Sequence, residues 1–188
     1  MFLMPVCAVP VVSGGGAAFT DDFNRADEDL TDSADWSVFA NGTGVAGVVS
    51  NELNLEATSG TDRVYYVESI QEVDAYAECT VGQTNWSSFL VVRATSRTEW
   101  VGCRSGGAEY DLFYQDGGFT SVATGTAAPV IGDTMRIEIS GNNARVLVNG
   151  VEDIGWTDIS AGPPSTGDRV GFCGRASNTA DDFEAGAL

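Results

Sequence analysis

Residues 135–156 read MRIEISGNNARVLVNGVEDIGW, and this stretch decides the fold class. Apolar and polar side chains alternate through Met135–Ser140 and again through Arg145–Asn149, which is the period of a strand with one buried face. Gly141-Asn142-Asn143 and Asn149-Gly150 separate these runs with residue types that form tight hairpin turns. The stretch therefore predicts a meander of three antiparallel strands that ends near Trp156.

The same alternation continues on both sides of this meander. In residues 73–81 five apolar side chains share one face, and Leu53 and Leu55 alternate with polar residues. About a dozen such short strands, separated by Gly- and Asn-rich turns, are typical of a sandwich or jelly roll. Arg25–Ala34 is compatible with either a short helix or a solvated loop. We therefore predict an all-β, antiparallel two-sheet sandwich over residues 19–188.

Charge and composition exclude several functions. The chain has 188 residues, 27 of them acidic and 9 basic, and its net charge is −18. Nucleic acids and anionic membrane surfaces are therefore not expected partners, because both require a basic surface. The chain has no His, and all nine basic residues are Arg. These absences exclude Ser-His catalysis, His-containing zinc sites and Lys Schiff bases.

The first 18 residues differ from the rest of the chain. The segment up to Val12 is apolar, Pro5 and Pro10 interrupt any helix, and no Lys or Arg precedes the apolar run. We expect an extended arm at residues 1–18, with a Gly-rich joint at Ser13–Gly16. An apolar arm alone in water should fray, so we expect it to pack against a neighbouring subunit.

Several segments resemble known domains. Thr20–Asp27, followed by Leu30 and Trp36, is similar to the opening of concanavalin A-like and laminin G-like domains. Later segments resemble a central strand and the closing strands of that superfamily: Phe89–Ala94, Gly132–Ile137, Val146–Gly150, Arg169–Phe172 and Ala180–Phe183. The resemblance spans residues 19–188 and implies a jelly roll whose first and last strands are adjacent. Such domains recur in lectins, glycan hydrolases and appendages of tailed-phage virions.

One segment bears on catalysis. Family 16 glycoside hydrolases, which share this fold, present Glu, Asp and Glu on alternate positions of one strand. Glu109–Gln115 supplies the first two carboxylates as Glu109 and Asp111, but Phe113 occupies the acid/base position. Without a second glutamate no group protonates the leaving oxygen. We therefore predict a core-facing strand, no catalytic residues and a protein that is not an enzyme.

Two acidic clusters lie near the ends of the domain. Asp22 and its neighbours converge with Asp182 and its neighbours if the first and last strands pair. Oxygen ligands gathered in this way suit Ca²⁺, and several relatives carry a structural calcium near this junction. Turn capping by the same side chains is the alternative. The sequence thus leaves open a structural calcium ion at Asp22 and Asp182.

Aromatic and basic residues are the candidates for sugar binding. Trp86, Trp100 and Trp156 could stack on sugar rings, and Arg93 or Arg104 could donate to hydroxyl groups. Trp100 and Arg104 share one face of the strand Thr98–Arg104, which makes Trp100 the best exposed candidate. We therefore predict carbohydrate-binding roles for Arg93, Trp100 and Arg104, although a core position remains the alternative for any single Trp.

The four cysteines show no metal-binding spacing. Cys7, Cys79, Cys103 and Cys173 lie far apart in the sequence, and the last three sit in apolar surroundings. Disulfides remain an alternative, but we expect free thiols that pack as small hydrophobic side chains.

These observations favour a structural protein of a tailed-phage virion, either a capsid decoration or a tail or fibre component. Residues 1–16 would attach it to other virion subunits, as a homo-oligomer or within a larger assembly. The lectin-like domain would lie on the outer surface, where it could contact host glycans, because packaged DNA repels a chain of charge −18. The alternative is a free, extracellular bacterial carbohydrate-binding module or lectin. A glycoside hydrolase is the least favoured of the three interpretations.

Overall fold

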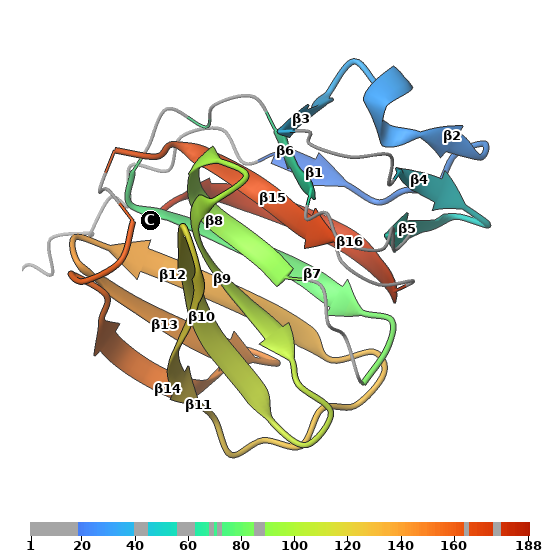
Figure 1. The fold of residues 1–188 in the computed structure, drawn as a ribbon. Coiled ribbons are helices and arrows are strands. Elements are labelled where there is room, and N and C mark those ends of the chain that lie inside the picture. The colour runs from blue at the N-terminus through green and yellow to red at the C-terminus, as the bar shows by residue number, and fades with distance from the viewer. Residues whose placement is uncertain are drawn as a thin grey trace, which may run out of the picture.

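The computed structural model describes residues 19–39, 45–55, 63–67, 70, 73–84, 89–163, 166–174 and 178–188. These residues form sixteen strands and one 3₁₀ helix, arranged in two antiparallel sheets packed face to face (Figure 1). The predicted all-β sandwich is confirmed. The predicted arm at residues 1–18 lies outside the described residues and stays a prediction. In the described part of the chain, no helix has the length and hydrophobicity needed to cross a membrane.

The nine-stranded sheet contains both ends of the domain. Its order is β14 (Val151–Asp158), β13 (Asn143–Val148), β12 (Thr134–Ser140), β7 (Ala75–Val81), β16 (Asn178–Ala187), β5 (Glu52–Leu55), β4 (Ala46–Val49) and β2 (Glu28–Asp29), and β1 (Phe19–Asp21) also pairs with β16. The predicted meander is therefore β12–β14. Its Asn149-Gly150 turn has positive φ at both residues, which Asn and Gly tolerate best. The predicted contact between the first and last strands is confirmed, because Phe19 pairs with Ala185.

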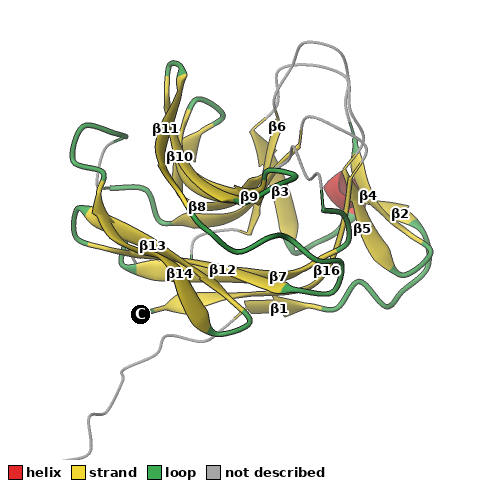
Figure 2. Cartoon of the chain, turned by 90° about the horizontal axis from the view of Figure 1, so that it is seen from below, coloured by secondary structure: helices red, strands yellow, loops and turns green. Residues whose placement is uncertain are grey.

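The seven-stranded sheet covers the other side of the core. Its order is β11 (Phe119–Thr124), β10 (Tyr110–Asp116), β9 (Glu99–Ser105), β8 (Phe89–Ser96), β15 (Arg169–Gly174), β6 (Arg63–Val67) and β3 (Trp36–Phe39). Figure 2 shows that this sheet curves, so that β10 and β11 at one edge and β6 and β3 at the other rise away from the nine-stranded sheet. Its outer face is therefore concave.

For residues 25–34 the sequence was compatible with a short helix or a loop. They form β2 and a single 3₁₀ turn, η1 (Leu30–Asp32), rather than an α-helix. Asp29 caps this turn because its side chain accepts a hydrogen bond from the backbone N–H of Thr31. Leu30 is the one buried residue of the turn, so little apolar surface supports a longer helix.

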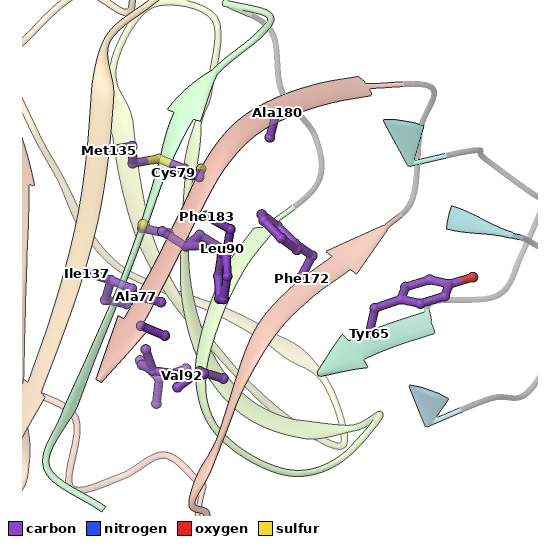
Figure 3. Packing of buried hydrophobic residues seen from close by; sticks show 14 of the residues in the cluster. Tyr65, Ala77, Cys79, Leu90, Val92, Met135, Ile137, Phe172, Ala180 and Phe183 are labelled. Atoms are coloured by element: carbon purple, nitrogen blue, oxygen red, sulfur yellow. The ribbon is translucent and has the colours of Figure 1, made fainter. Parts of the chain in front are cut away.

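The core lies between the two sheets. Cys79, Met135 and Ile137 from the nine-stranded sheet face Leu90 and Phe172 from the seven-stranded sheet (Figure 3), and all five are fully buried. Burial raises the pKa of the Cys79 thiol. The expected free thiols are confirmed for Cys79, Cys103 and Cys173, whereas Cys7 lies outside the described residues.

An aromatic cluster closes the core near η1. The Trp36 ring lies 5.2 Å from the Phe183 ring and 5.8 Å from the Phe172 ring, measured between centroids. The Trp36 indole N–H donates to Asp21 Oδ2 at 2.8 Å, and the Arg25 guanidinium pairs with the other oxygen, Oδ1. The Asp21 carboxylate thus joins β1 of one sheet to β3 of the other.

We expect Asp21→Ala to lower the free energy of unfolding by about 1–3 kcal/mol, because it leaves the indole N–H of buried Trp36 without its acceptor and removes one of the two carboxylates that pair with Arg25. Urea denaturation followed by tryptophan fluorescence measures this change. Asp35→Ala is the matched control, since Asp35 is exposed. Equal midpoints for the two variants would contradict the role given to Asp21.

Candidate functional site

The outer, concave face of the seven-stranded sheet carries two of the three predicted sugar-binding residues, Trp100 and Arg104. Strands β9 and β10 present three cross-strand pairs on this face, while the residues between them point into the core. The pairs are Trp100 with Gln115, Gly102 with Phe113, and Arg104 with Asp111. The predicted shared face of Trp100 and Arg104 is therefore confirmed, because residues two and four apart in a strand point the same way.

Arg104 and Asp111 form a charged pair on this face. Arg104 Nε donates to Asp111 Oδ2 at 3.2 Å, and Thr124 Oγ1 donates to Asp111 Oδ1 at 3.1 Å. The guanidinium also lies over the Phe113 ring, 4.7 Å from its centroid. The Arg104 side chain keeps 31% of its surface exposed. The pair therefore presents N–H donors and carboxylate lone pairs beside an aromatic ring, a combination suited to sugar hydroxyl groups.

Trp100 lies on the predicted face but is fully buried, so its expected exposure is wrong. Its ring covers Gly102, where an added Cβ would come within 3.0 Å of the ring. The indole N–H donates to the Arg97 carbonyl oxygen at 3.1 Å, and the ring meets Phe119 edge to face at 5.6 Å. Phe119, at 36% exposure, is the ring of this pair that solvent reaches.

The burial of Trp100 reflects a second apolar cluster that sequence reasoning missed. This cluster lies on the outer face of the seven-stranded sheet and contains Val64, Val91, Ala94, Trp100 and Cys173. The sequence could have predicted this cluster, because β8 and β15 carry apolar residues on both faces. A strand that buries both of its faces has a continuous apolar run instead of an alternating pattern.

Gln115 is a candidate that the sequence did not single out. Its side chain is 6% exposed, and its Oε1 has no hydrogen-bond partner among the described residues. A buried polar atom without a partner is costly and usually signals a missing ligand or water. Because Gln115 pairs with Trp100 across β9 and β10, this unsatisfied acceptor lies on the same face as Arg104.

Arg93 does not join this group. It is 3% exposed and has a positive φ at an irregularity in β8. Its guanidinium donates to the carbonyl oxygens of Val73 at 3.0 Å and Gly141 at 2.7 Å, beside the Asp74 carboxylate. These partners adjoin strands of the opposite sheet, so Arg93 joins the two sheets, whereas Trp100 and Arg104 lie on the outer face.

The predicted calcium residues come together. Asp22 and Asp182 line one cavity of about 670 Å³ beside β1 and β16. Asp22 Oδ1 accepts a hydrogen bond from the backbone N–H of Asn24, which lowers the pKa of this carboxyl. The pKa of neighbouring Asp181 is raised, first by burial and then by nearby carboxylates.

In the described part of the chain, Asp22 and Asp182 do not by themselves make up a full calcium site. No three Asp, Glu, Cys or His side chains in that part of the chain are grouped so that they could hold a metal. Ca²⁺ takes about six to eight oxygen ligands, of which Asp22 and Asp182 would supply a minority. The contact with Asn24 is the turn capping that the sequence left as the alternative. Calcium at Asp22 and Asp182 therefore stays a prediction.

The segment compared with family 16 hydrolases runs along β10. Glu109 is exposed just before this strand, where its carbonyl oxygen accepts a hydrogen bond from Gly106 N at 2.7 Å. Asp111 pairs with Arg104, and Phe113 lies under the Arg104 guanidinium. Tyr110 and Leu112 are buried in the core, as predicted for this strand.

No family model and no curated protein matches the chain. Similar solved structures exist, however. A Bacillus subtilis protein of unknown function with a galectin-like fold has a TM-score of 0.61 and 14% identity, with 91% of this chain and 96% of that chain covered. A Bacillus licheniformis beta-glucanase has a TM-score of 0.55 and 13% identity, with 92% and 99% covered.

A third similar structure is domain 4 of a family 43 extracellular arabinanase from Geobacillus stearothermophilus, in complex with arabinotriose. It has a TM-score of 0.54 and 12% identity, and 92% of each chain is covered. At these identities the likeness shows a shared fold. The chain has the concanavalin A-like jelly-roll fold that the sequence predicted, and it shares this fold with the galectin-like protein from Bacillus subtilis.

These matches correct the expectation that the chain is not an enzyme. Several similar structures are glycoside hydrolases or parts of them, so this jelly roll is compatible with enzymes. The expectation relied on the lack of a second glutamate in residues 109–115. The missing glutamate argues only against the family 16 arrangement of catalytic groups. The same fold can carry catalytic groups at other positions.

If Asp22 and Asp182 do bind calcium, adding calcium should raise the melting temperature and a chelator should lower it, because a ligand that binds only the folded state stabilises it. Differential scanning calorimetry of the chelated and calcium-loaded protein measures this shift. Asp22→Asn combined with Asp182→Asn should remove the response. Identical melting curves with calcium and with chelator would end the calcium prediction.

We expect Arg93→Ala to lower the free energy of unfolding by about 1–3 kcal/mol, because it removes a buried side chain and its hydrogen bonds to the carbonyl oxygens of Val73 and Gly141. Arg97→Ala is the matched control, since Arg97 takes part through its carbonyl oxygen. Chemical denaturation measures both variants. Unchanged stability of Arg93→Ala together with lost glycan binding would instead place Arg93 in a binding site.

Proposed function

We propose that the domain binds carbohydrate on the concave face of the seven-stranded sheet, beside Arg104 and Phe119. The observation that carries this proposal is the combination of a partly exposed Arg104–Asp111 pair, an unsatisfied Gln115 oxygen and an exposed Phe119 ring on one curved face. Sugars present hydroxyl groups around an apolar ring face, and this surface offers a complement to both.

Each group has a distinct role in this proposal. Arg104 donates to sugar oxygens, and the free lone pairs of Asp111 accept from hydroxyl groups. Gln115 Oε1 accepts one further hydroxyl hydrogen, which removes the cost of its unpaired state. Phe119 offers an apolar surface for a sugar ring, held in place by its edge-to-face contact with Trp100.

The similar structures support the class of ligand. One is a domain in complex with arabinotriose, and another is a carbohydrate-binding module from Bacillus subtilis. Their low identity leaves the ligand of this chain to be established from its own residues. Whether binding leads to cleavage of the glycan is a separate question, which the experiment below also addresses.

The setting predicted from the sequence is the outer surface of a tailed-phage virion, with residues 1–16 attached to other virion subunits. The net charge of −18 supports an exterior position, because it opposes contact with packaged DNA. Deleting residues 1–16 should then prevent incorporation into virions while the domain stays folded. A free extracellular module is the alternative, and a chain that is incorporated without the arm would remove the attachment role.

We expect the full chain to bind members of a panel of plant, bacterial and host glycans on an array. Arg104→Gln and Phe119→Ala should each weaken that binding at least tenfold, a change of about 1.4 kcal/mol in binding free energy. Isothermal titration with the strongest glycan measures the affinities. Release of reducing ends from the same glycan shows whether the protein also cleaves it.

Trp156→Ala is the control on the opposite sheet. Trp156 lies on β14, is 45% exposed, and has the Arg145 guanidinium 4.6 Å from its ring centroid. This variant should bind as the wild type does. Loss of binding in Trp156→Ala, with Arg104→Gln unaffected, would move the site to the nine-stranded sheet and overturn the proposal.

A further inference from the structure

Arg169 lies toward the other flank of the concave face, at the start of β15. Its guanidinium carbon is 5.0 Å from the Phe39 ring centroid and 4.8 Å from the Tyr66 ring centroid. The two rings are themselves 4.2 Å apart and inclined at 31°. Three strands, β3, β6 and β15, thus bring one arginine and two aromatic rings together.

The backbone enforces this arrangement. Gly171 in β15 pairs with Tyr66 in β6, and a Cβ on Gly171 would come within 2.0 Å of the Tyr65 carbonyl oxygen. Only glycine allows β15 to approach β6 this closely. Arg169 is two residues before Gly171, so this close approach carries its side chain to the Tyr66 ring.

Arg169 has no carboxylate partner among the described residues. Five other arginines in that part of the chain make ion pairs, namely Arg25, Arg93, Arg104, Arg136 and Arg145. The buried Arg169 Nε–H also has no hydrogen-bond partner there. In a chain with 27 acidic residues, a guanidinium that lies against two rings and has no carboxylate partner among the described residues is a candidate anion-binding group.

The chemistry of the guanidinium specifies the anion. Its planar set of N–H donors matches the two oxygens of a carboxylate or the oxygens of a sulfate, with two parallel hydrogen bonds. The Phe39 and Tyr66 rings fix the plane of the guanidinium through cation–π contact, so less side-chain freedom is lost when the anion binds. Arg104, the other arginine placed on this face, is already paired with Asp111.

We propose that Arg169, held by Phe39 and Tyr66, binds the carboxylate or sulfate group of an acidic glycan that lies on the concave face. This inference rests on the proposed glycan binding and names its ligand class. The net charge of −18 repels an anionic chain at long range, so recognition must come from direct contact. Salt at about 0.15 M screens that repulsion beyond roughly 8 Å.

The test compares matched glycans with the full chain at that ionic strength. Oligogalacturonates are titrated beside the same oligomers with methyl-esterified carboxyl groups, a sulfated galactan and a neutral glucan. We expect the wild type to bind the free acid at least tenfold more tightly than its methyl ester. Arg169→Gln should remove this preference but leave the affinity for the ester unchanged.

Two further variants separate binding from stability. Arg169→Lys keeps the charge but lacks the planar fork, so it should retain only part of the preference for the acid. Arg97→Gln removes one positive charge from the turn before β9 and should keep the full preference, which controls for net charge. Melting curves for every variant show whether a lost affinity comes from unfolding.

The outcomes are distinct. Equal affinity of the wild type for acid and ester, or an unchanged preference in Arg169→Gln, overturns this inference and leaves the proposed glycan binding intact. If Arg169→Gln is destabilised and loses binding to both the acid and the ester, Arg169 has a structural role. This result also overturns the inference. If no glycan in the panel binds, the proposed function itself fails. A tighter complex with the sulfated galactan than with the oligogalacturonate selects sulfate as the anion.

Discussion

The Asp21 carboxylate is the contact on which the sandwich depends at one end. It accepts from the Trp36 indole across the two sheets, pairs with Arg25, and accepts from the backbone N–H of Phe23. Phe23 has a positive φ, a backbone state that costs a non-glycine residue energy and needs compensation. At another place Arg93 joins the two sheets through Gly141 and its neighbours. Two polar contacts thus link the two sheets in addition to the apolar packing between them.

The two outer faces differ in how their charges are satisfied. On the nine-stranded sheet, Arg136 lies over the Tyr76 ring and pairs with Glu138, which also pairs with Arg145. These charges thus have partners within the protein. On the concave face, Gln115 Oε1 and Arg169 Nε have no hydrogen-bond partner among the described residues. Unsatisfied atoms also occur on strands of the nine-stranded sheet, at Asn54, Asp153 and Asn178. What distinguishes the candidate face is that its unsatisfied groups share it with Arg104 and the exposed Phe119 ring.

Sequence patterns predicted the layers well because alternation is a local property of a strand. They predicted the meander of β12–β14 and the shared face of Trp100 and Arg104, whereas the pairing of β1 with β16 was implied by the resemblance to concanavalin A-like domains. The exposure of a side chain is not a local property, since it depends on which residues cover that face of the sheet. Trp100 therefore appeared exposed although the outer apolar cluster buries it. Arg93 was misplaced for a related reason, because an irregularity in β8 turns its side chain away from the regular alternation.

The positions of the two unsatisfied groups constrain the size of a ligand. Gln115 lies on β10 and Arg169 on β15, and β9 and β8 stand between them in the sheet. Three inter-strand spacings amount to about 14 Å along the curved surface. A single sugar ring spans far less than this distance, so one molecule that satisfies both groups must be an oligosaccharide crossing the strands. Between these two groups the outer-face side chains Trp100, Val91 and Cys173 are fully buried. Such a ligand would therefore be recognised mainly at its two ends, near Gln115 and near Arg169.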